Sequence, residues 1–370
     1  MAVAQLVESR IVIPVVVGSS PISHPSIQTP VSMRHSSRWG CTIRPRTAGL
    51  FCLWPVGISM ENCVNNDEVS AVANNDPHLE LIAGEKLTFA AKRLFFEGSN
   101  GDYMPVGSQL GILLALSFRD DSGHHTTGSA AMVGPGLAVC AAHVLQDQGY
   151  PEKLASGETT LVAQAPLPGG MLLWTVLRFS LVPNADLAVL SLTLSSSFPE
   201  NRHFDFASIT TRMPAVGDEL TITGLSAIRR TEAVSSATHL EMVPGCVKGL
   251  VIDSYPEGRD RAMLPGPCFA VDCDARGGMS GGPVFDSRGH LVGVVSSSYE
   301  GGATTFVSHV WPALVRADAC PVWPIEPYPL PATGTLLHLG RRFGISIDRP
   351  DAFKLCALNG EVALSYEAWQ

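Results

Sequence analysis

The segment of this 370-residue chain best suited to chemistry is Ser280, set among glycines in the run GGMSGGP at residues 277–283. A serine hydroxyl is a weak nucleophile unless a base removes its proton and donors stabilise the oxyanion that forms. Glycine adopts backbone angles that side chains forbid, so the amides of Gly278 and Ser280 could face one pocket as such donors. The alternative is a glycine-rich hairpin turn without chemistry.

A candidate base and a candidate orienting acid precede this serine. His143 ends the apolar run LAVCAAH, and Asp186 opens the strand-like run DLAVL. Taken alone, one histidine among 11 is most often a packed or surface residue, and such an aspartate is often a turn or capping residue. An aspartate that enters an apolar strand is nevertheless partly desolvated, which is costly unless hydrogen bonds reach its carboxylate.

The order of these three residues along the chain narrows the possibilities. Among the common serine triads, the order His, Asp, Ser is that of chymotrypsin-type enzymes. With these motifs, residues 106–318 resemble the trypsin-like serine peptidases of the chymotrypsin superfamily, in their disulfide-poor bacterial form. The resemblance implies that Ser280 attacks a scissile carbonyl, His143 carries the proton and Asp186 orients the imidazole. It also implies an oxyanion hole made by the amides of Gly278 and Ser280.

Two further residues gain roles from the same resemblance. Ser296, in the run VVSSS, matches the family's serine that hydrogen-bonds the triad aspartate, although a solvent-facing serine is the alternative. Asp274 lies six residues before Ser280, where trypsin has the acidic base of its specificity pocket. A basic substrate residue would suit that position, but Arg276 could neutralise the carboxylate and Asp272 competes for the alignment.

The chain also departs from the family at two kinds of position. Met279 replaces the aspartate that pairs with a newly cut N-terminus in digestive members, so we expect activity without proteolytic maturation. Val144 and Arg276 replace cysteines of family disulfides, and nine cysteines without regular spacing indicate free thiols in a reducing compartment. We therefore expect a cytoplasmic protein, with a secreted or periplasmic one as the alternative.

The elements that must position these residues are short and strand-like. From about residue 80 to 318, apolar runs of strand length alternate with Gly, Pro, Asp and Ser, which predicts an all-β fold. The resemblance implies two six-stranded antiparallel β-barrels of the chymotrypsin type with short terminal extensions. The first, at about 106–195, would hold His143 and Asp186, and the second, at about 205–318, would hold Ser280.

Both ends of the chain look like extensions. Residues 1–59 lack any sustained period, and their opening resembles a peptide translated from a tRNA gene. They are a gene-model artefact with Met60 as the true start, or else a disordered or targeting leader. Residues 60–105 are a lead-in. Residues 319–370 are a proline-rich linker and a tail, in which Asn359-Gly360 could turn a small hairpin.

The composition of the chain limits the classes of partner that the protein is expected to bind. A formal net charge of -9 without any Lys/Arg-rich run predicts no nucleic-acid partner, and the longest apolar runs are too short for a membrane span. We expect no metal and no cofactor, because neither metal-ligand spacing nor a phosphate-binding loop stands out. The sequence thus predicts a serine endopeptidase acting on proteins or peptides, with an inactive pseudoprotease that binds proteins as the alternative. It leaves the oligomeric state open.

Overall fold

The computed structural model describes most of the chain from residue 86 onward, together with two short N-terminal strands. The described residues are 11–15, 68–72, 86–99, 102–105, 111–120, 123–146, 153, 159–167, 170–196, 199, 203–231, 238–298, 303–323, 333–358 and 361–369. Of the expected leader at 1–59, only 11–15 belong to this set, and Met60 lies outside it.

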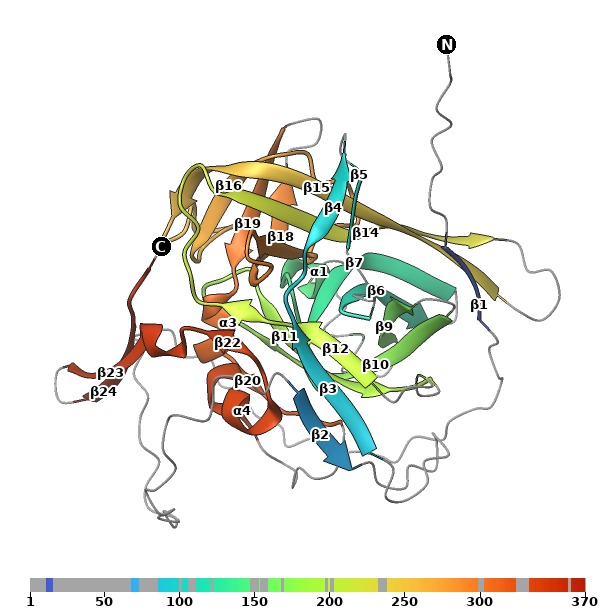
Figure 1. The fold of residues 1–370 in the computed structure, drawn as a ribbon, viewed down its shortest axis with the longest axis horizontal. Coiled ribbons are helices and arrows are strands. Elements are labelled where there is room, and N and C mark those ends of the chain that lie inside the picture. The colour runs from blue at the N-terminus through green and yellow to red at the C-terminus, as the bar shows by residue number, and fades with distance from the viewer. Residues whose placement is uncertain are drawn as a thin grey trace.

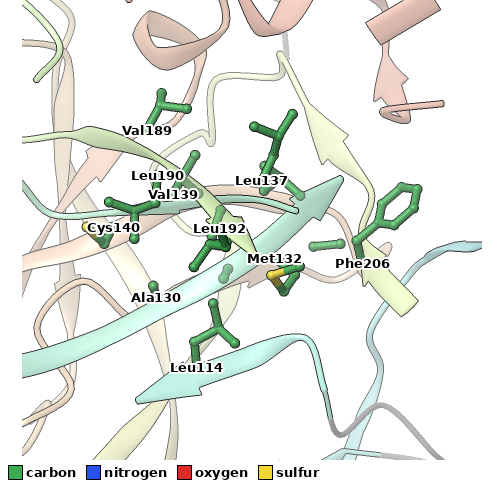
Figure 2. Packing of buried hydrophobic residues seen from close by; sticks show 14 of the residues in the cluster. Leu114, Ala130, Met132, Leu137, Val139, Cys140, Val189, Leu190, Leu192 and Phe206 are labelled. Carbon is green, nitrogen blue, oxygen red and sulfur yellow. The ribbon is translucent and has the colours of Figure 1, made fainter. Parts of the chain in front are cut away.

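The first barrel is a closed ring of six antiparallel strands, in the order β10-β11-β8-β7-β6-β9. Its strands are β6 (Leu113–Asp120), β7 (Gly123–Gly134), β8 (Leu137–Cys140), β9 (Thr160–Leu167), β10 (Gly170–Leu181) and β11 (Ala188–Leu194). Figure 2 shows side chains such as Leu114, Val139 and Leu190 gathered in its interior, where each is shielded from solvent. Burial of one such side chain contributes ~1.5–3 kcal/mol, and closure leaves no open sheet edge.

The second barrel also closes with six strands. They are β14 (Glu219–Thr231), β15 (Thr238–Tyr255), β16 (Cys268–Asp272), β17 (Pro283–Asp286), β18 (Leu291–Ser298) and β19 (Thr304–His309). The path β17-β14-β15-β16-β19-β18 is closed by the additional β17–β18 pairing. Two six-stranded antiparallel barrels confirm the predicted fold class. In Figure 1 β14 and β15 continue past the barrel as a long ribbon, and β1 (Ile11–Val15) pairs with the far end of β15.

The lead-in contributes to the core of the first barrel. Strand β3 (Lys86–Lys92) pairs in parallel with β12 (His203–Ala207) and antiparallel with β2 (Glu68–Val72). Phe89 on β3 is fully buried and contacts the rings of Phe204 and Trp323 at centroid distances of 5.6 and 5.7 Å. A hairpin of β4 (Phe96–Ser99) and β5 (Asp102–Pro105) follows. The described part of residues 60–105 is therefore more than an appended lead-in.

The C-terminal segment carries the remaining short elements. They are α3 (Trp311–Val315), β20 (Asp318–Ala319), β21 (Gly334–Thr335), α4 (Leu336–Phe343), β22 (Ile347–Asp348), a 3-10 turn (Pro350–Ala352), β23 (Phe353–Leu358) and β24 (Glu361–Tyr366). Strands β23 and β24 form a hairpin in which Leu358 pairs with Glu361, and the expected turn residues Asn359-Gly360 lie outside the described residues. None of the helices in the described ranges is long and apolar enough to cross a membrane.

The tail holds the connection between the two barrels. Strand β13 (Ile209–Thr210), in that connection, pairs in parallel with β18 on one side and β22 on the other. Trp369 donates from Nε1 to Thr211 Oγ1 at 2.8 Å, and its carbonyl accepts from Met213 N at 3.0 Å. The segment expected to be a proline-rich linker and tail thus adds β22 to the sheet of the second barrel.

Candidate active site

Sheet register brings His143 and Asp186 together. Strands β8 and β11 are antiparallel neighbours in which Cys140 pairs with Ala188. The chain leaving β8 therefore meets the chain entering β11, and the short helix α1 (His143–Gln146) begins close to Asp186. His143 N donates to Asp186 Oδ1 at 2.9 Å, and His143 Nδ1 lies 2.8 Å from Asp186 Oδ2.

The carboxylate of Asp186 has further support from the second barrel. Ser296 on β18 donates from Oγ to Asp186 Oδ2 at 2.6 Å, and Ser308 Oγ on β19 lies 2.7 Å from Ser296 Oγ. An ionised carboxylate can only accept hydrogen bonds, so Ser296 donates its hydroxyl proton to Asp186. The oxygen of Ser296 must then accept a hydrogen bond from Ser308. The result is a directed chain from Ser308 through Ser296 to Asp186. The sequence indicated Ser296, whereas nothing in it singled out Ser308.

These contacts also fix the state of the imidazole. Because the carboxylate accepts, the proton of neutral His143 lies on Nδ1, and Nε2 keeps its lone pair. That tautomer is the one a general base needs. The thiol of nearby Cys140 offers no rival nucleophile, because burial and, secondly, the charge of Asp186 hold its pKa far above the ordinary range.

Two consecutive turns form the loop that carries Ser280, residues 276–282, which we call the nucleophile loop after the role predicted for Ser280. In the first, Met279 N donates to Arg276 O at 3.1 Å and Gly278 has φ of +88°. In the second, Gly282 N donates to Met279 O at 2.8 Å and Gly281 has φ of +78°. A left-handed third residue identifies a type II turn, a geometry that favours glycine there. The Met279 carbonyl faces Gly282, so the Ser280 N–H of the same planar peptide points the opposite way.

Close backbone packing places this loop beside His143. A Cβ at Gly128 would lie 2.6 Å from Ser280 O and 2.9 Å from Val144 Cγ2. The Ser280 carbonyl and the Val144 side chain therefore both lie close to Gly128. A Cβ at Gly281 would overlap the carbonyl of Ser129 on β7 and lie 3.1 Å from Ala141 N. The backbone around Ser280 is thus flanked by Ala141, two residues before His143, and by Val144, directly after it.

The side chain of Met279 anchors the nucleophile loop to the second barrel. Its side chain is fully buried in the core of the second barrel. Gly224 on β14 and Gly245 on β15 are directly paired across the sheet and leave a notch for it. A Cβ at Gly224 would lie 2.8 Å from Met279 Cα, and one at Gly245 would lie 2.9 Å from Met279 Sδ. The notch was missed in the sequence, although glycine inside a strand signals such a close approach.

The segment before the loop bears on specificity. Cys273 and Ala275 are buried, and Asp272, Asp274 and Arg276 are exposed. Thr305 Oγ1 on β19 donates to Cys273 O at 2.8 Å and accepts from Ala275 N at 3.1 Å, which fixes the backbone on either side of Asp274. Recognition of a basic substrate residue by Asp274 stays a prediction.

Comparison with known families gives the observation that decides which family the peptide segment around these residues matches. A model described as "trypsin-like peptidase domain" matches residues 128–294, which include His143, Asp186 and Ser280. This segment is a trypsin-like peptidase domain. The two closed barrels, whose strands run from Leu113 to His309, agree with this match, because they form a chymotrypsin-like fold.

Several solved structures are similar to the peptidase domain. Deg5 shares 20% identity over 55% of this chain and 85% of its own, with a TM-score of 0.38. The active form of the Rv3671c protease from M. tuberculosis shares 16% over 54% and 76%, with a TM-score of 0.37. The MamO protease domain from Magnetospirillum magneticum shares 17% over 54% and 90%, with a TM-score of 0.35. A comparison with curated proteins gives no match.

Within the part of the chain that the structure describes, no three His, Cys, Asp or Glu residues are grouped so that they could hold a metal ion. His124 and His125 pair with Arg119 and Phe118 across the β6–β7 ladder. The side chains assembled around Asp186 are those of His143, Ser296 and Ser308. The chemistry that this set offers is proton transfer to and from a hydroxyl.

Proposed function

We propose that this domain is a serine endopeptidase that cleaves protein or peptide substrates through an acyl-enzyme intermediate. The observation that carries the proposal is the hydrogen-bonded set Ser296, Asp186 and His143, next to the loop that presents Ser280. A buried aspartate with two hydrogen-bonded partners, aligned with an imidazole, is the arrangement that activates a serine hydroxyl.

In the first half of the reaction, Ser280 Oγ attacks the scissile carbonyl carbon and its proton moves to His143 Nε2. Asp186, 2.8 Å from Nδ1, stabilises the imidazolium that results. The N–H groups of Gly278 and Ser280 stabilise the oxyanion of the tetrahedral intermediate. His143 then protonates the leaving amine, and the acyl group remains as an ester on Ser280.

In the second half, a water molecule replaces the amine. His143 removes a proton from the water, which attacks the ester carbonyl, and then returns the proton to Ser280 Oγ as the acid product leaves. In each half of the reaction, His143 acts first as the base and then as the acid. The route needs neither a metal nor a cofactor.

Hydrolysis of an unstructured protein and of a mixed fluorogenic peptide library tests the proposal. We expect the wild-type protein to cleave, and Ser280→Ala to lose at least about 10³-fold in rate, because the hydroxyl that forms the ester is gone. Ser287→Ala, at an exposed serine outside the site, is the matched control and should cleave like wild type. A wild-type protein that binds such chains without cutting them would favour the inactive binding module instead.

A further inference from the structure

Ser129 contacts the nucleophile loop from the opposite barrel. It lies on β7 of the first barrel, next to Ala130, which Figure 2 shows among the core side chains. Its main-chain N–H donates to Ser280 O at 2.7 Å, and its hydroxyl donates to Gly278 O at 2.9 Å. One fully buried residue thus holds the carbonyls of Gly278 and Ser280, the two residues whose amides would bind the oxyanion.

The hydrogen-bonding roles of the hydroxyl are determined by its neighbours. Leu225 N on β14 donates to Ser129 Oγ at 2.9 Å, so a lone pair of the oxygen is taken. The Gly278 carbonyl can only accept, which commits the hydroxyl proton to it. Ser129 therefore joins three separate pieces of chain: β7 of the first barrel, β14 of the second, and the nucleophile loop.

The position of Gly278 matters because of its turn type. The type II turn at residues 276–279 differs from a type I turn in φ of its third residue, near +80° in one and near -90° in the other. Changing from one to the other rotates the Gly277–Gly278 peptide and so turns the Gly278 N–H away. Both glycines permit that rotation, and the loop therefore needs a restraint from outside. The carbonyl that Ser129 binds belongs to the next peptide, Gly278–Met279, so this bond holds Gly278 against β7 through the peptide that adjoins the rotating one.

We propose that Ser129 is a positioning residue that fixes the oxyanion-binding amides relative to the barrel carrying His143 and Asp186. This role rests on the proposed peptidase function and extends it to a residue of the first barrel. Ser129 does not touch the reacting atoms. It acts through Gly278 and Ser280, so its loss slows the reaction without removing any group that takes part in proton transfer.

The test compares Ser129→Thr with Ser129→Val, which have the same shape and differ in the hydroxyl. The readout is the second-order rate constant for reaction with a fluorophosphonate, whose phosphoryl oxygen occupies the oxyanion site, measured from pH 5 to 9. Ser117→Ala is the matched control, because Ser117 is equally buried in the first barrel and donates only to Gln164 Oε1, at 3.0 Å. Thermal unfolding is recorded for every variant.

We expect Ser129→Val to react about 10- to 100-fold more slowly than Ser129→Thr, less than the loss from removing an oxyanion donor itself. The pH midpoint should stay that of wild type, and Ser117→Ala should react at the wild-type rate. Equal rates for the Thr and Val variants would overturn the proposal. So would a Val variant that fails to fold while the Thr variant folds, because the hydroxyl would then serve the fold. If the wild-type protein does not react at all, the proposed peptidase function is wrong. That result differs from a failure of the Ser129 proposal alone.

Discussion

At the scale of single residues, the site depends on the carboxylate of Asp186. It is 9% exposed and accepts hydrogen bonds from His143 N, from Ser296 Oγ and, at 2.8 Å, from the imidazole. Such partners offset the cost of taking a charge out of water. In the proposed mechanism the function of this carboxylate is to hold the proton of His143 on Nδ1.

Replacing Asp186 by asparagine tests that function. The amide can present an N–H to the imidazole, which moves the ring proton to Nε2 and leaves no lone pair for Ser280. We expect kcat/KM for a fluorogenic peptide to fall about 10³- to 10⁴-fold, with circular dichroism unchanged. A loss of less than about 10-fold would show that Asp186 does not set the tautomer.

Residue types and their order along the chain were enough to nominate His143, Asp186 and Ser280 as a candidate triad, and a resemblance to the family indicated Ser296. Ser308 and Ser129 could not be found in this way. Ser308 reaches Ser296 only because β18 and β19 pair with Val294 opposite Ser308, and Ser129 reaches the loop across the barrel boundary. Both roles depend on register and on contacts between distant segments, which single residues do not encode.

At the scale of elements, the paired strands β14 and β15 support the nucleophile loop through the glycine notch. An apolar side chain in a notch replaces the ion pair of the digestive enzymes. Because Met279 directly precedes Ser280, we expect the depth to which its side chain enters the notch to set the position of the Ser280 hydroxyl.

Alanine substitutions in the notch should differ in severity. At Gly224 the new methyl group meets the Met279 backbone, whereas at Gly245 it meets the mobile end of the side chain. We expect Gly224→Ala to lower kcat/KM at least about 10-fold more than Gly245→Ala, and to lower the free energy of unfolding by about 1–3 kcal/mol, as overpacking does. Peptide kinetics and urea unfolding measure both. Equal effects would mean that the notch does not position the loop.

The strands of the two barrels could be predicted because each carries a local pattern of apolar runs and turn residues. The sheet formed by β3 and β12 could not, because its parallel pairing joins residues more than a hundred positions apart. The same is true of β22, which joins β13. Short strands with distant partners leave no local signal.

At the scale of the whole molecule, the segment joining the barrels is held by His309. This buried residue donates from Nε2 to Arg212 O at 2.7 Å and accepts from Trp311 N at 3.1 Å. The bond from Trp311 needs the lone pair of the neutral ring, and burial lowers the pKa of His309 from 6.5 to about 4. Protonation therefore competes with the native arrangement.

Acid should weaken the fold through this residue. Between pH 6.5 and about 4 the unfolded chain binds the proton and the folded chain does not, so the free energy of unfolding decreases as pH falls through this range. The decrease amounts to about 3 kcal/mol for His309 alone. Urea unfolding at pH 4 to 7.5 should give a shallower pH dependence for His309→Gln than for wild type. Identical slopes would contradict the assignment.

Activation is also a property of the whole chain. Since Met279 is held by the glycine notch and its thioether cannot form an ion pair, we predict that no newly cut N-terminus is needed for activity. We expect protein with an uncleavable N-terminal fusion to hydrolyse a peptide within about 3-fold of the rate seen after removal of the fusion, which is a change of less than about 1 kcal/mol in barrier. A fused protein that becomes active only after trimming would show that another segment gates the site.

The most direct test of the central claim is the position of a fluorophosphonate adduct in the wild-type protein, determined by mass spectrometry of its peptides. The account predicts one phosphonylated residue, Ser280, and a labelling rate at least about 10³-fold lower in His143→Ala, because the base is lost. Labelling at another serine, or rapid labelling of Ser280 in the absence of the imidazole, would contradict it.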